Sequence, residues 1–331
     1  MTPAQPAGCR RKREQMGQFL ESIEKTRVSL PPMDAAKLKY VAVVTMLIDH
    51  AACVFLERTQ TADGRYLMDV LAGGALLDRI LRAVGRQAFP VFCFFLVEGF
   101  FYTRSRVRYL IRLAVFALLS QEPFRQCIFP RSDQLHANVM CTLLLGLLAI
   151  WCIDALGTVF LEDPPGNGVH AEPGYTDGHG APAGVENNPD IREAAGPAGK
   201  EEKSVLARVF CELPGGKAAE SLLRRGIFLL AAAGTVYGFC RLGILVRTDY
   251  SYGGIVLIIL LYLLRDYRIC ALFFSWLWLG WYNQFEIYAA PAFLLLACYN
   301  GKRGRQQKYF FYAFYPAHLA LLWGLRVLLF P

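Results

Sequence analysis

Apolar residues occur along this chain in long runs, which are separated by short polar segments. A helix that crosses roughly 30 Å of hydrocarbon needs about 20 mostly apolar residues. The runs predict nine transmembrane helices, near residues 38–57, 89–103, 109–120, 138–160, 223–245, 252–265, 269–282, 286–299 and 309–330. Because the runs between 252 and 299 are short and tightly joined, eight to ten helices fit the pattern. The predicted fold class is an all-α, polytopic integral membrane helical bundle.

The distribution of basic residues orients these helices. Cytoplasmic loops of membrane proteins are enriched in Lys and Arg. If the N-terminus is cytoplasmic, all nine lysines fall in segments that are then inside. No short apolar core with a cleavage site precedes the first run, so we expect a cytoplasmic N-terminus in the inner membrane. The main exception is the cluster Arg79, Arg82 and Arg86, which follows a segment, 67–77, that we interpret as re-entrant or interfacial.

Two polar regions adjoin the membrane domain, which we place at 37–331. Residues 1–36 are polar and basic and are expected to form a cytoplasmic tail. Residues 162–203 are rich in Gly, Pro and acidic residues and have few large apolar ones. Such a segment cannot bury enough surface to offset its ordering entropy. It is therefore predicted to be a disordered cytoplasmic loop, and its His170 and His179 are interpreted as solvated.

Composition argues against two other kinds of function. The formal net charge is +8, but topology explains the basic residues, and no basic stripe with interleaved aromatic residues marks a nucleic-acid surface. The ten cysteines include no CxxC pair and no Cys/His cluster with zinc-ligand spacing. We therefore expect neither nucleic acid nor a metal as a partner.

Four ionisable residues interrupt the apolar runs: Asp49 and His50 in the first, Glu98 in the second and His318 in the last. Such residues are costly in a bilayer and are functional candidates by default. At 1.5 Å per residue, His50 lies about 18 Å from the start of its helix, and Glu98 and His318 each lie about 14 Å from theirs. All three thus fall near mid-depth and can share one cavity.

Histidine is suited to accept and return a proton near pH 7. Asp49 and His50 are sequence neighbours, so their side chains diverge on the helix and another helix has to orient His50. Glu98 is the expected partner, and a purely structural ion pair or hydrogen bond between His50 and Glu98 is the alternative. His318 follows Pro316, where a structural hydrogen bond explains a polar residue as well as a ligand role does.

Further candidates lie near the helix ends. Arg86 is placed to pair with Asp49 or to bind an anionic or carbonyl group. His136 and Asn138 lie at the expected outer mouth of the fourth helix. A set of cytoplasmic basic residues can bind the phosphates of a nucleotide-bearing donor, and topology alone is the alternative explanation. The members of this set are Arg104, Arg106, Arg108, Arg112, Lys302, Arg303 and Arg305.

Several collinear motifs resemble the TraX family of membrane proteins. They are LKYVAVVTMLIDH, GRQAFPVFCFFLVEGFFYTR, SQEPF, HANVMCTLLLGLLAI, YNGKRG and KYFFYAFYPAHL. The resemblance covers roughly 37–155 and 225–330 and leaves out the polar loop. Two motifs depart from the expected pattern, with Arg125 in place of an acidic residue and Ala137 in place of Gln.

The resemblance implies a membrane acyltransferase, since the family's namesake is linked to N-terminal acetylation of conjugative pilin. Acetyl-CoA would be the donor, and a pilin-like peptide or an envelope glycan the acceptor. His50 would act as general base, oriented by Glu98, with Asp49 in the catalytic group. Arg86 or Asn138 would position the acceptor or the polarised carbonyl.

Two other classes of function remain open at this stage. A proton-coupled transporter would use the same buried groups for proton relay, although no two-fold repeat is evident. A non-catalytic membrane component of a conjugation machine would be held by partner contacts alone.

Overall fold

The computed structural model describes residues 32–61, 63–129, 136–161, 218–305 and 308–330, with Val205 and Val209. Within these residues the chain is helical and forms no β-strand, which confirms the all-α class. The expected loop 162–203 and all but the last five residues of the expected tail 1–36 lie outside the described residues.

The elements follow one another in short succession. In chain order they are α2 (Ala35–Ala52), the π-helical turn η1 (Cys53–Glu57), α3 (Leu67–Val70), α4 (Gly74–Gly85), α5 (Ala88–Tyr102), α6 (Arg106–Ile128), α7 (Val139–Leu161), α10 (Ala218–Leu245), α11 (Ser251–Leu263), α12 (Arg268–Tyr282), the 3-10 helix η2 (Gln284–Ala289), α13 (Ala290–Ala297) and α14 (Lys308–Leu329). Each predicted run overlaps one of these helices.

Five helical segments in the described part of the chain are long and apolar enough to cross a membrane, judged by length and composition. They are Ala35–Glu57, Gly74–Tyr102, Val139–Leu161, Leu222–Leu245 and Tyr309–Leu329. α11 and the segment Gln284–Ala297 are apolar but shorter. The chain is therefore a helical protein with several apolar helices of membrane-spanning length, whereas the count of nine spans and their orientation stay predictions.

The second of these segments is longer than the sequence pattern indicates. α4 and α5 together give an apolar stretch from Gly74 to Tyr102, whereas the expected run began at residue 89. The difference arises because Arg82 and Arg86 make α4 look polar. Both side chains are directed toward α2, where they pair with Asp49.

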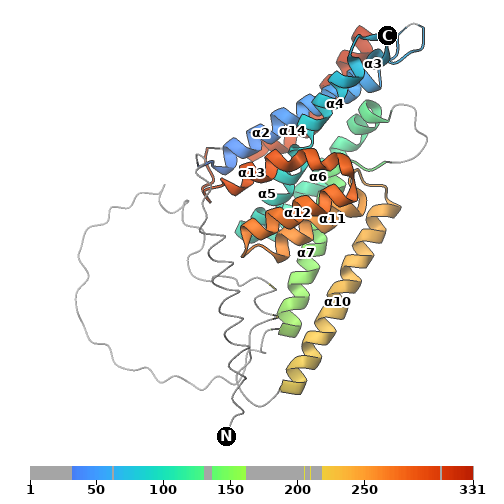
Figure 1. Cartoon of the computed structure of the whole chain (residues 1–331). Coiled ribbons are helices and arrows are strands. Elements are labelled where there is room, and N and C mark those ends of the chain that lie inside the picture. The colour runs from blue at the N-terminus through green and yellow to red at the C-terminus, as the bar shows by residue number, and fades with distance from the viewer. Residues whose placement is uncertain are drawn as a thin grey trace.

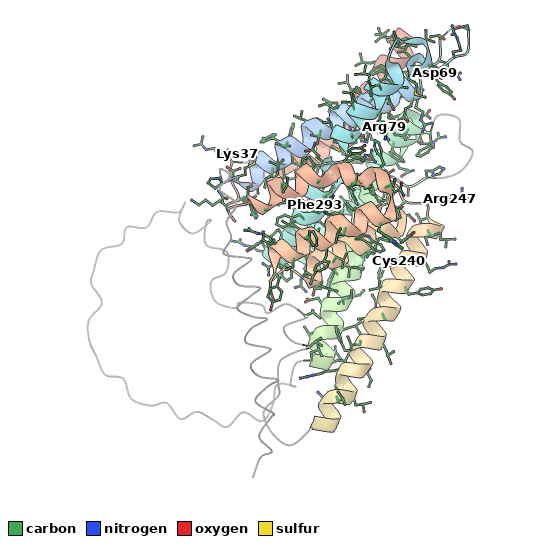
Figure 2. All side chains as sticks on the ribbon, in the orientation of Figure 1. Lys37, Asp69, Arg79, Cys240, Arg247 and Phe293 are labelled. Carbon is green, nitrogen blue, oxygen red and sulfur yellow. The ribbon has the colours of Figure 1, made fainter. Side chains whose placement is uncertain are left out.

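The helices pack in a layered arrangement that leaves a large apolar exterior. α2, α4 and α14 run side by side, and α10 lies along α7 (Figure 1). The side chains of α10 project away from the rest of the molecule (Figure 2), and apolar residues such as Leu230 and Leu245 are more than three-quarters exposed. An apolar face of this size is typical of a surface that contacts lipid.

Local sequence sets both ends of α2. The Asp34 side chain caps its start by accepting a hydrogen bond from the Lys37 amide at 2.8 Å, which satisfies one of the free amide groups of the first turn. Its last turn passes into η1, and the Thr59 hydroxyl donates to the Val54 carbonyl there at 2.9 Å. π-helical turns inside helices are frequent at functional sites, and this one follows directly after Asp49 and His50.

Candidate functional site

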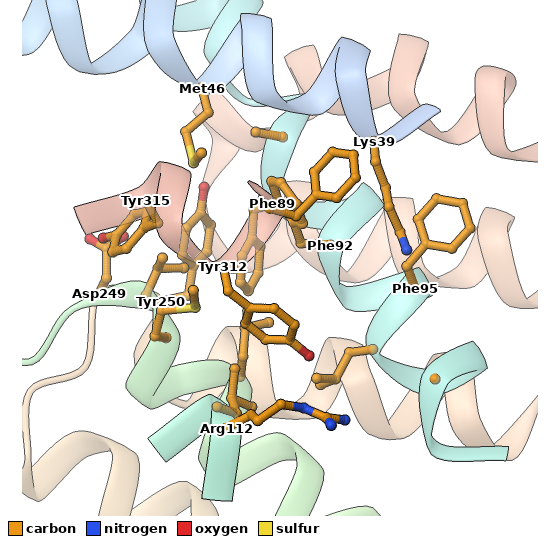
Figure 3. Close-up of a pocket in the computed structure, with 18 of the residues that line it drawn as sticks. Lys39, Met46, Phe89, Phe92, Phe95, Arg112, Asp249, Tyr250, Tyr312 and Tyr315 are labelled. Atoms are coloured by element: carbon orange, nitrogen blue, oxygen red, sulfur yellow. The ribbon is translucent and has the colours of Figure 1, made fainter. Parts of the chain in front are cut away.

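A cavity of about 920 Å³ occupies the space between α2, α4, α5, α6, α7 and α14. Aromatic residues form much of its wall, among them Phe89, Phe92, Phe95 and Tyr312 (Figure 3). The two ends of the cavity differ in chemistry, because one carries only cations among its charged groups and the other carries His50 beside acids and arginines.

The cationic end gathers basic residues from four segments of the chain. They are Lys39 on α2, Arg104 after α5, Arg108 and Arg112 on α6, and Arg303 before α14. Four of the five residues predicted to bind a cofactor thus line one cavity. Arg112 retains a buried Nε that has no hydrogen-bond partner among the described residues. Such an end is suited to a polyanionic group.

The structure changes the predicted set of cofactor-binding residues at two lysines, Lys302 and Lys39. Lys302 does not line the cavity, and its amide donates to the Asn300 side chain at 2.9 Å. Lys39 was not predicted, although its ammonium lies 4.8 Å from the centre of the Phe95 ring and faces the cavity. Lys39 is the second residue of the predicted run 38–57, where a lysine is typical of the end of a membrane helix.

At the other end, His50 is hydrogen-bonded to His318 across two helices. The His50 Nδ1 and His318 Nε2 atoms are 2.7 Å apart, and the ring centroids lie 5.0 Å apart at an interplanar angle of 11°. His318 is only 4% exposed and its Nδ1 lies 2.7 Å from the Phe314 carbonyl oxygen. His50 lines the cavity, whereas His318 lies behind it.

This chain of contacts fixes the tautomers of both rings in the neutral state. A carbonyl oxygen only accepts, so the proton of His318 has to sit on Nδ1. Its Nε2 is then an acceptor, and His50 has to donate to it from Nδ1. The remaining nitrogen of His50, Nε2, is left with a lone pair. The arrangement therefore presents an oriented base at the cavity wall.

Glu98 does not orient His50, and that prediction is wrong. Its carboxylate lies 3.6 Å from Arg265 Nε, and Arg265 in turn lies over the Phe101 ring at 3.9 Å. Glu98 does not line the cavity. The rise per residue predicts a depth for Glu98, but depth does not specify which side of α5 the side chain occupies.

A cluster of six charged side chains surrounds the His50 end, and its outermost pair is Arg58 and Glu57 at 3.9 Å. Asp49 binds Arg82 at 2.7 Å and Arg86 at 2.8 Å, which confirms the expected pairing of Arg86 with Asp49. Arg82 also binds Glu57 at 3.0 Å, and Arg86 binds Glu286 at 3.0 Å. Asp49 is thus held by two guanidinium groups, so its geometry suits the anchoring of arginines rather than proton transfer.

Gly85 allows this cluster to form. A Cβ atom at this position would lie 2.2 Å from the Cβ of Asp49 and 2.3 Å from its Oδ1. Only a residue without a side chain lets α4 approach α2 so closely. The glycine therefore brings Arg82 and Arg86 within reach of the Asp49 carboxylate.

His136 and Asn138 lie away from the cavity, so their expected role in binding the acceptor has no support in the geometry. The His136 ring stacks on Phe129 at 4.2 Å. Asn138 is fully buried; its amide donates to the Ala117 carbonyl at 2.8 Å and to Gln121 at 2.9 Å. Its side-chain oxygen accepts from the Met140 amide at 2.9 Å. Asn138 therefore fastens the start of α7 to α6.

Asp249 and Tyr250 line the His50 end and were not predicted. They lie in the short connection between α10 and α11, whose sequence, VRTDY, has the composition of an ordinary surface loop. The only signal in the sequence was an acidic residue directly beside two apolar runs.

The profile of the family described as "TraX protein" matches residues 34–160 and 224–326, which is more than half of the chain. The chain belongs to the TraX family. Both matched ranges carry cavity residues, among them His50, Asp249 and the four arginines of the cationic end.

One TraX-like relative carries a description of its own. A "Probable fimbrial assembly protein FimC, serogroup H1" from Dichelobacter nodosus is 36% identical over 124 residues, which are 35% of this chain and 45% of that protein. The chain thus spans less than half of this relative's length. No solved structure matches this TraX protein.

Proposed function

We propose that this protein is a membrane-embedded acyltransferase that moves an acetyl or acyl group from acyl-CoA to an amine or hydroxyl acceptor. One observation carries the proposal: a single cavity joins a cluster of cations to His50, whose Nδ1 is held by His318 so that its Nε2 keeps a lone pair. The TraX family and a relative named for fimbrial assembly support an acceptor of the pilin type.

The cationic end suits the phosphate groups of coenzyme A. Arg104, Arg108 and Arg303 offer planar guanidinium groups that bind phosphate oxygens in pairs. By the orientation predicted from the basic residues, this end faces the cytoplasm, where acyl-CoA is available. Arg112 and Lys39 lie farther along the same wall and continue the positive potential into the cavity.

The length of the cavity fits the donor. Lys39 and His50 lie eleven residues apart on α2, so their levels differ by about 16 Å at 1.5 Å per residue. The pantetheine arm has about a dozen bonds from phosphate to sulfur, equal to four residues of extended chain, or roughly 14 Å. A donor held by its phosphates at the cations would bring its thioester close to His50.

His50 would act as general base on the acceptor. Its Nε2 takes a proton from the attacking nitrogen or oxygen as that atom bonds to the thioester carbon. The carbon–sulfur bond then breaks, and the protonated His50 returns the proton to the leaving thiolate. His318 is a positioning residue, because its hydrogen bond fixes the tautomer that leaves Nε2 free.

Donor titration tests the proposal. Acetyl-CoA is added to the protein in detergent, and thermal stability and release of free thiol are followed for the wild type, His50→Ala, Arg303→Ala and Lys302→Ala. Loss of a general base should lower the rate about 10²–10⁴-fold, with donor-induced stabilisation retained in His50→Ala. Arg303→Ala should weaken stabilisation, whereas its sequence neighbour Lys302 lies outside the cavity and serves as the matched control. Full thiol release in His50→Ala would rule out the mechanism.

A further inference from the structure

The His50 end of the cavity contains a carboxylate that takes part in none of the ion pairs of the cluster. Asp249 lines the cavity, and its side chain makes no hydrogen bond or ion pair with the residues that the structure describes. Desolvation by the protein around the cavity raises the pKa of the Asp249 carboxyl, and the Arg86 guanidinium opposes this shift. The residue keeps an exposed surface, so a ligand in the cavity can reach its unpaired carboxylate.

Charge balance in this region favours a cation as that ligand. Arg82 and Arg86 supply two positive charges, and both are already bound by Asp49 and by their further partners Glu57 and Glu286. One Oε atom of Glu286 still has no hydrogen-bond partner among the described residues. With Arg58, which lies 3.9 Å from Glu57, the cluster has three carboxylates and three guanidinium groups, so Asp249 adds a negative charge that has no arginine of its own.

Two tyrosines complete the surroundings of Asp249. Tyr315 is 3% exposed, and its buried hydroxyl lies close to the Val139 backbone without a hydrogen bond of good geometry. It lies within electrostatic reach of Asp249 on the same side of the cavity (Figure 3), and its ring centroid is 6.1 Å from that of His50. Tyr250 stacks on Phe89 with the centroids 3.6 Å apart. Aromatic faces and a carboxylate together are suited to hold an ammonium group.

We propose that Asp249, Tyr250 and Tyr315 form a subsite for the ammonium group of the acceptor, in which Asp249 also takes the first proton. The inference rests on the proposed acyl transfer and names the group that binds the acceptor beside His50. Tyr315 lies next to both residues, since its ring is 6.1 Å from that of His50 and it is within electrostatic reach of Asp249.

Proton balance supports two bases rather than one. An ammonium ion and a thioester give an amide, a thiol and one free proton. The nitrogen therefore loses two protons: one before it can attack, and one as the carbon–nitrogen bond forms. Asp249 takes the first and releases it to water; His50 takes the second and returns it to the thiolate. A hydroxyl acceptor loses only one proton and needs only His50.

The test separates this inference from the proposed function. The probes are a long-chain alkyl amine and the alcohol of the same chain length, each added to the protein in detergent. Without acetyl-CoA, the amine should raise the thermal stability of the wild type but not of Asp249→Asn. The alcohol should raise the thermal stability of neither protein. Asp69→Asn, an exposed residue outside the cavity, serves as the matched control. Equal stabilisation of wild type and Asp249→Asn by the amine, or no stabilisation of either, would overturn the subsite.

With acetyl-CoA present, the same variants report on turnover. Loss of a hydrogen bond to a charged group should raise KM for the amine about 10- to 100-fold in Asp249→Asn. Tyr315→Phe, which removes only an oxygen atom, should raise it about 3- to 10-fold. Stabilisation by acetyl-CoA should be unchanged in both. An unchanged KM for the amine in an Asp249→Asn variant that still binds acetyl-CoA would refute the role of Asp249. A wild-type protein that does not bind acetyl-CoA would instead refute the proposed transferase activity and leave the amine subsite to the first experiment.

Discussion

In the ion cluster beside His50, the loss of Asp49 and the loss of Arg86 should destabilise the protein to different extents. Three carboxylates, Asp49, Glu57 and Glu286, pair with three guanidinium groups. Arg82 and Arg86 each bind Asp49 and one further acid, whereas Arg58 reaches only Glu57, at 3.9 Å. Replacing Asp49 by Asn leaves Glu57 and Glu286 each still paired with an arginine. Replacing Arg86 by Gln leaves Glu286 without its arginine partner. We therefore expect the arginine variant to be the less stable of the two.

The magnitudes follow from burial and from the number of bonds lost. Asp49→Asn weakens two charge-assisted bonds but keeps the shape of the side chain, so it should lower the free energy of unfolding by about 2 kcal/mol. Arg86→Gln leaves Glu286, whose side chain is 2% exposed, without a cation, and a broken buried pair costs about 3–5 kcal/mol. The double variant should cost less than the sum, because Asp49 and Arg86 share a bond.

Thermal unfolding in one detergent measures the order of these variants. At roughly 2–4 °C per kcal/mol, Asp49→Asn should lower Tm by about 4–8 °C and Arg86→Gln by clearly more. Arg79→Gln is the matched control, since Arg79 is exposed on the same helix (Figure 2) and should change Tm by under about 2 °C. An Asp49→Asn variant less stable than Arg86→Gln would refute the reasoning from charge balance.

Three further predictions concern other residues. Glu98→Gln should leave thiol release within about two-fold of wild type in the donor assay, because Glu98 pairs with Arg265 outside the cavity. Asn138→Ala should lower the free energy of unfolding by about 2–3 kcal/mol, measured by the same thermal unfolding, because it removes three buried hydrogen bonds. Gly85→Ala should displace Asp49 and lower Tm at least as much as Asp49→Asn does.

The sequence predicted the helices but not which way the side chains face. His50, Glu98 and His318 all lie in helical segments of membrane-spanning length, so the rise per residue predicts similar heights for them. Whether Glu98 or His318 meets His50 depends on the rotation of each helix and on which helices are neighbours. Such information is absent from an apolar run, because lipid-facing and protein-facing positions are both apolar.

In loops too, the sequence does not specify which side chains face the cavity. Lys302 and Arg303 are neighbours in one basic motif, yet only Arg303 lines the cavity. The glycines on either side, Gly301 and Gly304, both have φ near +70°, so the backbone turns sharply there and neighbouring side chains point to different places. Composition predicted a basic cluster correctly, but the backbone path selected its functional member.

The arrangement of helices links the two ends of the cavity mechanically. α2 carries Lys39 near its start and His50 near its end, and α5 is flanked by Arg86 on one side and Arg104 on the other. Each helix thus connects the cationic end with the histidine end. Any shift of α2 or α5 along its axis moves groups at both ends together. The short charge-assisted bonds between α2 and α4 oppose such a shift, so we interpret the ion cluster as the element that fixes the level of α2 relative to α4 and with it the position of both ends.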